Sequence, residues 1–340
     1  MRNLLRTAAA VALLLSGSAL TLGATDFFAR DFGAKPDGVT LNTASIQAAI
    51  DFASSRGGGR VVLDKGEYVS GSIYLKNNVT LHIEKDAVLL GSLNPYDYIK
   101  DPDAKWTALV FGINQDKIGI TGEGMINCRG FEVGVRFVDF VHMGLIVDPL
   151  GLDRINETIR PENLHFYKST NIVIKDITLK DPASWNQQYD KCRNLLIEGI
   201  TVDAKCYWNN DGLDVVDCSD VIVRDCYIDS SDDAYCFKSH SNDGVSENIL
   251  VENCVGRSSA NGIKFGTYTR GKFKHFRFKN MTIFDTYRSA ITIATVDGAQ
   301  IEDVEIDSLK SLNTGNPIFL RTGTRHVNDG QQAYLKDIVI

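Results

Sequence analysis

The sequence predicts a parallel β-helix, an all-β solenoid in which each sequence repeat forms one turn of a coil. From residue 171 onward a polar residue followed by alternating aliphatic residues recurs at intervals of 23, 26, 28, 27 and 28 residues. Each repeat holds short runs rich in Val, Ile, Thr and Phe, separated by Gly, Asn, Asp and Ser, with no room for a strand and a long helix. This period fits one coil per repeat, with inward aliphatic side chains stacked into a single core. The repeats begin at Asn171, Asn194, Asp220, Asn248, His275 and Asp303.

The polar residue that begins each repeat is expected at a corner of the coil. An Asn side chain at such a corner can hydrogen-bond to the equivalent position on the neighbouring coil. A leucine-rich horseshoe has a similar period, but its LxxLxLxxN signature is absent.

The segment before the repeats is predicted to close the open end of the coil. Residues 44–53 have the pattern of a short amphipathic helix, with Thr43 as the candidate N-cap and the glycine run 57–59 after its end. Strands follow at 60–63 and 79–83. A capping helix here would cover strand edges that otherwise invite aggregation. The apolar positions of the helix are Ile46, Ala49, Ile50 and Phe52.

Residues 1–24 have the pattern of a signal peptide. Arg2 and Arg6 precede an apolar run at 8–15, and small residues allow cleavage after Ala19 or Ala24. The apolar run is shorter than the roughly 20 residues that a membrane span needs. We therefore expect a secreted or periplasmic protein with no membrane span once this segment is removed.

The rest of the chain, residues 25–340, is expected to form one β-helix domain. Residues 336–340 have the pattern of a strand that opens another coil, and no cap follows them. This predicts that the domain is truncated at its C-terminus. We further expect a monomer.

Composition excludes some classes of partner. The formal charge of −7 argues against nucleic acid, which would require a basic patch. It leaves open a polyanionic substrate, because Lys and Arg can cluster locally within an acidic chain. The seven cysteines have no zinc-type spacing, so no metal or other cofactor is expected; they are interpreted as buried thiols, with one or two disulfides left open.

Two acidic clusters in the middle of the chain are the candidate catalytic residues. The 21 residues between Asp211 and Asp232 correspond to one repeat, which would stack the two clusters on adjacent coils. Three carboxylates would then share one patch, and their mutual repulsion would raise at least one pKa. Hydrolysis of a glycosidic bond needs one carboxylic acid and one carboxylate. The alternative is that both clusters only close turns, where Asp and Gly are common. The clusters are Asn209-Asn210-Asp211-Gly212-Leu213-Asp214 and Ser230-Ser231-Asp232-Asp233.

Taken together with other motifs in the same order, these clusters resemble glycoside hydrolase family 28, the pectin-degrading polygalacturonases and their relatives. The resemblance runs from about Asp31 to the C-terminus, and the acidic clusters are similar to the family's NTDGxD and GDD motifs. It implies a single-stranded, right-handed parallel β-helix and hydrolysis with inversion. The other motifs are Asp31-Phe-Gly-Ala-Lys-Pro-Asp-Gly, Ile46-Gln-Ala-Ala-Ile, Gly57-Gly-Gly, Ile120-Thr-Gly-Glu-Gly-Met-Ile and the stretch 160–185.

The resemblance also implies roles for individual residues. Asp232 is similar to the family's general acid, and Asp211 and Asp233 to the pair that holds and activates water. Lys238 matches the lysine of the family's IKSG stretch. The candidate substrate-binding residues are Asn209, Lys238, Asn261 and Lys264, with Trp185 and Trp208 as aromatic residues that either stack on a sugar or fill the core.

Two departures from the family pattern concern substrate binding. Asn261 stands where the family has the histidine of a Gly-His-Gly motif. The stretch 290–294 lacks the Arg-x-Lys pair that grips the substrate carboxylate, although Lys264, Arg270 and Arg288 are nearby in sequence. These departures are typical of a relative that acts on a different sugar or linkage.

The predicted function is a glycosidase that cleaves α-galacturonosidic or closely related linkages in a pectic polysaccharide. One alternative is a pectate-lyase-like enzyme that acts by β-elimination, commonly with Ca²⁺ and an Arg or Lys base; the Asp-Asp motif argues against it. Another is a carbohydrate-binding β-helix without turnover, which the two departures favour.

Overall fold

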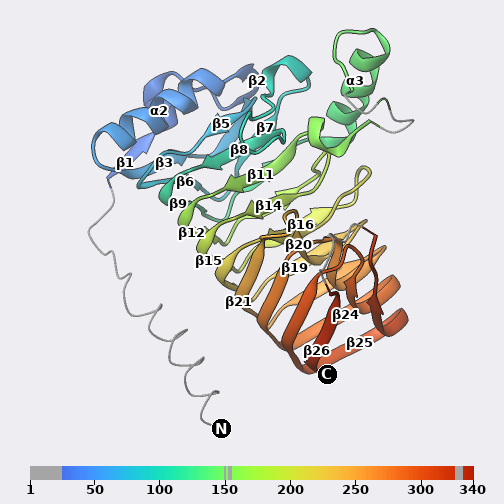
Figure 1. The fold of residues 1–340 in the computed structure, drawn as a ribbon. Coiled ribbons are helices and arrows are strands. Elements are labelled where there is room, and N and C mark those ends of the chain that lie inside the picture. Colours follow the sequence, from blue (N-terminus) through green and yellow to red (C-terminus); the bar gives the residue numbers. More distant parts are fainter. Residues whose placement is uncertain (1–24, 149–150, 152–154, 326–331) are drawn as a thin grey trace.

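The chain winds into a right-handed parallel β-helix with three strands in most turns, as predicted (Figure 1). This computed structural model describes residues 25–148, 151, 155–325 and 332–340. The predicted signal peptide lies outside the described residues. Strands of successive coils pair in parallel along the axis and form three long faces, named here sheets one, two and three.

Each sheet takes one strand from each successive coil. Sheet one contains β1 (Asp26–Phe28), β3 (Gly59–Leu63), β6 (Val79–Ile83), β9 (Asp116–Thr121), β12 (Thr170–Lys175), β15 (Arg193–Glu198), β18 (Ser219–Arg224) and β21 (Val245–Glu252). Sheet two contains β2 (Asp37–Leu41), β4 (Gly66–Ser70), β7 (Ala87–Gly91), β10 (Met125–Asn127), β13 (Thr178–Lys180), β16 (Thr201–Ala204), β19 (Tyr227–Ser230) and β22 (Val255–Ser258). Sheet three contains β5 (Ile73–Tyr74), β8 (Ala108–Ile113), β11 (Glu162–Tyr167), β14 (Gln187–Asp190), β17 (Leu213–Val216), β20 (Tyr235–Ser239) and β23 (Asn261–Thr269).

The last coils are built from longer strands. β24 (Lys272–Thr295) and β25 (Gln300–Thr322) each bend through all three faces, and β26 (Tyr334–Val339) pairs with the start of β25 in sheet one. The register stays regular in β24 against β25, with Phe276 opposite Val304 and Ile291 opposite Ile318. The strands predicted at 60–63 and 79–83 are present as β3 and β6.

The corner that enters sheet one explains the repeated polar residue. Asn171, Asn194, Asp220, Asn248, His275 and Asp303 all have positive φ, between 54° and 60°. Asn and Asp tolerate this left-handed conformation better than most residues. The predicted side-chain contacts along the stack are also present: the Asn194 amide donates to Oδ1 of Asn171, and the Asn248 amide donates to Oδ1 of Asp220.

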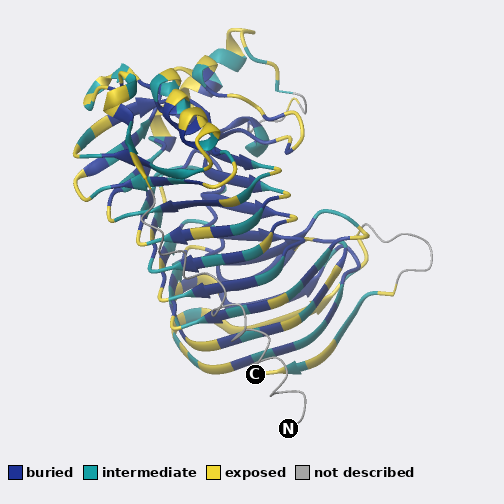
Figure 2. Cartoon of the chain, turned by 90° about the vertical axis from the view of Figure 1, so that its left-hand side faces the viewer, coloured by how far each residue is buried: buried dark blue, intermediate teal, exposed yellow. Residues whose placement is uncertain are grey.

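The interior of the coil is a stacked apolar core, which Figure 2 shows as buried residues on the inner faces of successive coils. Aromatic rings dominate its lower half, where the Phe265 ring lies 5.4 Å from that of Phe237 and 4.9 Å from that of Phe276. All seven cysteines are free thiols, and all except the half-buried Cys206 are buried, so the disulfide alternative is not realised.

The predicted capping helix is α2 (Thr43–Ser55), which covers the N-terminal end of the coil (Figure 1). Its core-facing residues include Ile46, Ala49 and Ile50, as expected, whereas Phe52 is largely exposed. The N-cap prediction was wrong by one residue: Asn42 is the N-cap and Thr43 opens the helix. The Thr43 hydroxyl instead accepts a hydrogen bond from the Gly71 amide, which ties the helix to the coil beneath it.

An insertion between β10 and β11 was not predicted. It contains α3 (Gly130–His142) and the 3-10 turn η3 (Glu157–Ile159), and α3 projects beside the upper coils (Figure 1). Two more 3-10 turns are η1 (Ala29–Phe32) and η2 (Pro95–Asp97). Among the described residues, no helix combines the length and the apolar character needed to cross a membrane.

Candidate active site

The predicted acidic residues lie on the outer face of sheet three, where β17, β20 and β23 begin. Side chains alternate along a strand, so core residues such as Leu213 and Tyr235 alternate with outward ones. The backbone register stacks one outward position over five coils. From the N-terminal to the C-terminal side, this column consists of Gln188, Asp214, Cys236, Lys264 and Thr292.

A second outward column holds two of the predicted catalytic carboxylates. Leu213 lies opposite Tyr235, and the Gly212 amide donates to the Asp233 carbonyl at 2.8 Å, so the same register places Asp211 beside Asp233. The sequence prediction that Asp211 stacks on Asp232 is therefore wrong by one residue. The coil is 22 residues long at this point, as the pairing of Leu213 with Tyr235 shows, rather than the assumed 21.

The turns that present these carboxylates are held by hydrogen bonds between coils. The Asn210 amide donates to the carbonyls of Pro182 and Ser184, which fixes the residue just before Asp211. The Asp232 carbonyl accepts from the hydroxyls of Ser230 and Ser258, each at 2.6 Å. These bonds order the backbone on which the catalytic side chains are mounted.

Lys238 binds two carboxylates on the coil above it. Its Nζ lies 2.8 Å from Oδ2 of Asp211 and also donates to Oδ1 of Asp214, and all three side chains are buried. Burial raises the pKa of Asp214 to about 6, against the attraction of the ammonium. Burial also raises the pKa of Asp211, and the nearby ammonium opposes that rise. For Lys238 itself burial works against the charge, but Asp211 and Asp214 hold its pKa well above 10.5.

Asp233 has its own set of partners from the next coil. Its Oδ1 accepts from the Asn261 amide at 2.6 Å, and its Oδ2 accepts from Nζ of Lys264 at 2.7 Å. The Asn261 carbonyl oxygen in turn accepts from the Thr292 hydroxyl at 2.9 Å. Asn261 thus occupies the position of the expected histidine as a neutral donor to a buried carboxylate.

Asp232 differs from its neighbours in its electrostatic surroundings. Within the described part of the chain it has no ion-pair partner, whereas Asp211 and Asp233 each have a lysine. Its carboxylate oxygen accepts only the Asp233 amide, at 3.0 Å. Partial burial, followed by the negative charge of Asp233, raises the pKa of Asp232 above its ordinary value. The cluster therefore contains lysine-bound carboxylates beside one carboxyl group that favours its proton.

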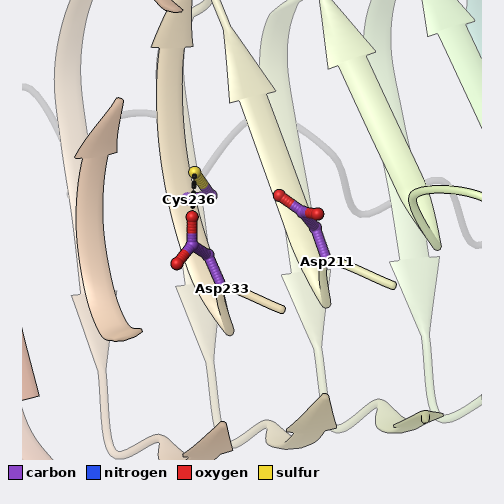
Figure 3. A group of neighbouring side chains, drawn as sticks. All are labelled: Asp211, Asp233 and Cys236. Carbon is purple, nitrogen blue, oxygen red and sulfur yellow. Dashed lines mark hydrogen bonds between the residues drawn. The ribbon is translucent and has the colours of Figure 1, made fainter. Parts of the chain in front are cut away.

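Three buried side chains approach one another closely enough to be considered as a metal site. Asp211, Asp233 and Cys236 each place one potential ligand atom within 4.8 Å of the others (Figure 3). Burial raises the pKa of the Cys236 thiol well above 9, which disfavours the thiolate that a metal would need. Both carboxylates already bind lysine ammonium groups. The donor set therefore does not fit a divalent cation.

The two predicted tryptophans lie in different environments. Trp185 is only 3% exposed, and its ring is covered by Nζ of Lys238 at 3.4 Å from the centroid and by Trp106 at 4.5 Å. The prediction of a sugar-binding role for Trp185 is corrected accordingly, because the ring is packed against Lys238. Trp208 is 51% exposed and can still stack on a sugar.

Asn209, the remaining predicted binding residue, is half-buried with a positive φ of 56°. Its Oδ1 accepts from the buried Arg160 guanidinium at 2.9 Å. It therefore helps to fix the turn that carries Asp211, and only part of its amide group faces the cleft side.

Several polar residues of the site were not singled out in the sequence. Asp214 shares Lys238 with Asp211, and its place between core residues Leu213 and Val215 marks it as outward-facing. Glu162 and His165 form a buried pair at 2.8 Å on the N-terminal side of the cluster. Burial lowers the pKa of His165 to about 4 and raises that of Glu162 well above its ordinary value. No local motif distinguishes Glu162 or His165 from other strand residues.

Comparisons with known proteins agree with this geometry. A family model described as glycosyl hydrolases family 28 matches residues 60–333. A Vitis vinifera protein named "Probable polygalacturonase" is 30% identical over 327 residues, which cover 91% of this chain and 58% of that protein. The Dickeya chrysanthemi exo-poly-alpha-D-galacturonosidase is 23% identical over 286 residues, covering 70% of this chain and 47% of that protein. The chain thus spans about half the length of these relatives.

Solved structures are similar in fold. The hyperthermoactive exopolygalacturonase of Thermotoga maritima superimposes with a TM-score of 0.75 and 20% sequence identity, over 92% of this chain and 79% of that one. At this identity the likeness concerns the right-handed parallel β-helix alone.

Proposed function

The chain belongs to glycosyl hydrolases family 28, and from that membership we propose that it hydrolyses α-galacturonosidic or closely related linkages in a pectic polysaccharide. The observation that supports this most directly is the unequal charge environment of the acidic residues. Asp211 and Asp233 are bound by lysines, whereas Asp232 has no such partner among the described residues and its pKa is raised. Glycosidases need this division into a protonated acid and an ionised base.

In the proposed reaction Asp232 protonates the glycosidic oxygen as the bond to the leaving sugar breaks. Asp211 and Asp233 hold a water molecule and accept its proton as it attacks the anomeric carbon from the opposite face, which inverts the configuration. Lys238 and Lys264 keep these two carboxylates ionised inside a buried site. Hydrogen bonds to Asn261 and to the two lysines orient them before substrate arrives.

The two departures from the family pattern affect binding more than acid–base chemistry. Asn261 still donates to Asp233, so its substitution for histidine removes a titratable group and keeps the hydrogen bond. The positions of the missing Arg-x-Lys pair are occupied by small or uncharged residues, among them Ala290 and Thr292. We place the enzyme outside the cytoplasm as a monomer, after removal of residues 1–24.

The test compares Asp232→Asn with the parent on polygalacturonan, scored by new reducing ends. The matched control is Asp243→Asn, an exposed aspartate in the loop after β20. We expect loss of at least about 10²-fold in activity for the first variant, since general acid catalysis contributes about 10² to 10⁴, and no change for the second. NMR of the first product should show the inverted anomer.

Two results would contradict the proposal. Products with an unsaturated, UV-absorbing end would identify a lyase. A parent that binds pectin but releases no reducing ends from polygalacturonan, rhamnogalacturonan or aryl glycosides would identify a binding protein.

A further inference from the structure

A groove of about 420 Å³ opens beside the acidic cluster, toward the C-terminal coils. Asn261 and Lys264, which both bind Asp233, line its upper end, so the groove begins at the candidate catalytic residues. Every ionisable residue of its lining is basic: Lys264, Arg288, Arg321 and Arg325. This is a concentration of positive charge in a chain whose formal net charge is −7.

The four cations are not equally available to a ligand. Lys264 is engaged by Asp233 at 2.7 Å, and Arg325 binds both oxygens of the buried Asp297 at 2.7 and 3.2 Å. Arg288 and Arg321 are exposed, and neither has an ion-pair partner among the residues that the structure describes. The groove therefore presents two guanidinium groups whose charge is not compensated.

These two arginines lie along the direction in which the coils stack. Asn261 is opposite Ser289, and Ser289 is opposite Asn316, on the two following coils. Arg288 precedes Ser289, and Arg321 lies opposite Ala294 on the next coil. With strands about 4.8 Å apart, Arg288 is about 10 Å and Arg321 about 14 Å from the coil of Asp233 along the axis.

We propose that Arg288 and Arg321 form a subsite that reads carboxylates on the sugars of an anionic uronate polymer beside the cleaved bond. The inference rests on the proposed function and specifies its substrate. A guanidinium matches a carboxylate with two parallel hydrogen bonds, which a neutral ester cannot reproduce. These arginines are not at the aligned Arg-x-Lys positions, since Arg288 lies just before that stretch and Arg321 comes from the following coil.

The experiment measures binding rather than turnover. The Asp232→Asn protein is titrated by calorimetry with polygalacturonate oligomers, with the same oligomers fully methyl-esterified, and with a sulfated galactan of similar length. Arg288→Gln and Arg321→Gln are added singly and together. Arg257→Gln is the matched control, because Arg257 lies outside this groove and is paired with Asp229.

We expect the free acid to bind at least about tenfold more tightly than the ester. Each groove substitution should weaken binding of the acid by about tenfold, leave binding of the ester within about twofold, and flatten the salt dependence. Arg257→Gln should bind like its parent.

Equal binding of acid and ester, an unchanged preference in the double variant, or no binding of either form would overturn the proposal. Tighter binding of the sulfated polymer would assign the subsite to sulfate and would equally overturn the uronate assignment. None of these results depends on hydrolysis, so the activity of the unmodified chain tests the proposed function separately.

Discussion

Lys238 is the buried ammonium on which the acidic cluster depends, and its replacement by methionine is the sharpest test of the electrostatic account. Methionine has a similar length and packs readily in buried sites. The substitution removes the charge that lies 2.8 Å from Asp211 and in contact with Asp214, while the Trp185 ring above it remains covered.

The expected cost follows from the burial of all three groups. Removing one partner of a buried ion pair leaves an uncompensated charge and costs about 3–5 kcal/mol, which is a large part of the usual 5–15 kcal/mol of folding free energy. Here two carboxylates lose the same cation. We therefore expect a loss in the free energy of unfolding at or above the upper end of that range at pH 8.

The loss should depend on pH with a defined sign. Burial raises the pKa of Asp214 from 3.8 to about 6 in the folded protein. Between these values the folded state binds more protons than the unfolded state, so stability falls as pH rises, by about 3 kcal/mol for such a shift. Without the ammonium the pKa values of both carboxyls rise further. The fall then steepens and extends above pH 6, so the variant is less impaired at pH 4.5 than at pH 8.

Urea unfolding at pH 4.5 and pH 8 measures this difference. The matched control is Lys205→Met, because Lys205 also bridges two aspartates, Asp203 and Asp229, but on the surface. Exposed pairs contribute about 0–1 kcal/mol, so the control should lose little at either pH. The reasoning is refuted if the two variants lose the same free energy at pH 8, or if the loss in Lys238→Met is the same at both pH values.

Four further predictions concern the site and the core. Asn261→Ala removes a donor to Asp233, and kcat/KM measured by reducing ends should fall by about 5- to 150-fold, as expected for a buried group left unsatisfied; an unchanged rate would exclude a role in orienting Asp233. Trp208→Ala should raise KM without changing the melting temperature, because the ring is half exposed, and an unchanged KM would contradict sugar stacking. Phe265→Ala should cost about 3–5 kcal/mol in urea unfolding, since the ring is fully buried; a loss below 1 kcal/mol would contradict the described core packing. A thiol reagent should label only Cys206 in the native protein and all seven cysteines after denaturation, and rapid labelling of more than one native thiol would contradict the described burial.

The coil could be predicted from the sequence because its period is written in residues with a conformational reason to recur. Asn171, Asn194 and Asn248 mark corners with positive φ, and the aliphatic residues after them fill the core. The capping helix was found for the same kind of reason, an apolar face at helical spacing. Its N-cap was misplaced because the Thr43 hydroxyl bonds to the next coil instead of to its own helix.

The site was predicted less completely, because its geometry depends on the length of one coil. An error of one residue in that length paired Asp211 with Asp232 instead of Asp233. The motif identified the right acids, but it held no information on the burial of Trp185 under Lys238. Arg321 was missed because the groove brings together residues from separate coils, which local patterns do not reveal.

The left-handed corners have a consequence for how such a molecule can be enlarged. Each corner is a joint at which one complete loop of the spiral closes and the next begins with the same backbone conformation. A segment cut from joint to joint, such as residues 248–274, contains every strand needed for one loop. Duplicating it should insert an extra storey of about 4.8 Å while the storeys above and below keep their pairing partners. Lengthening the substrate path would then be a matter of copying, with no redesign of the interior.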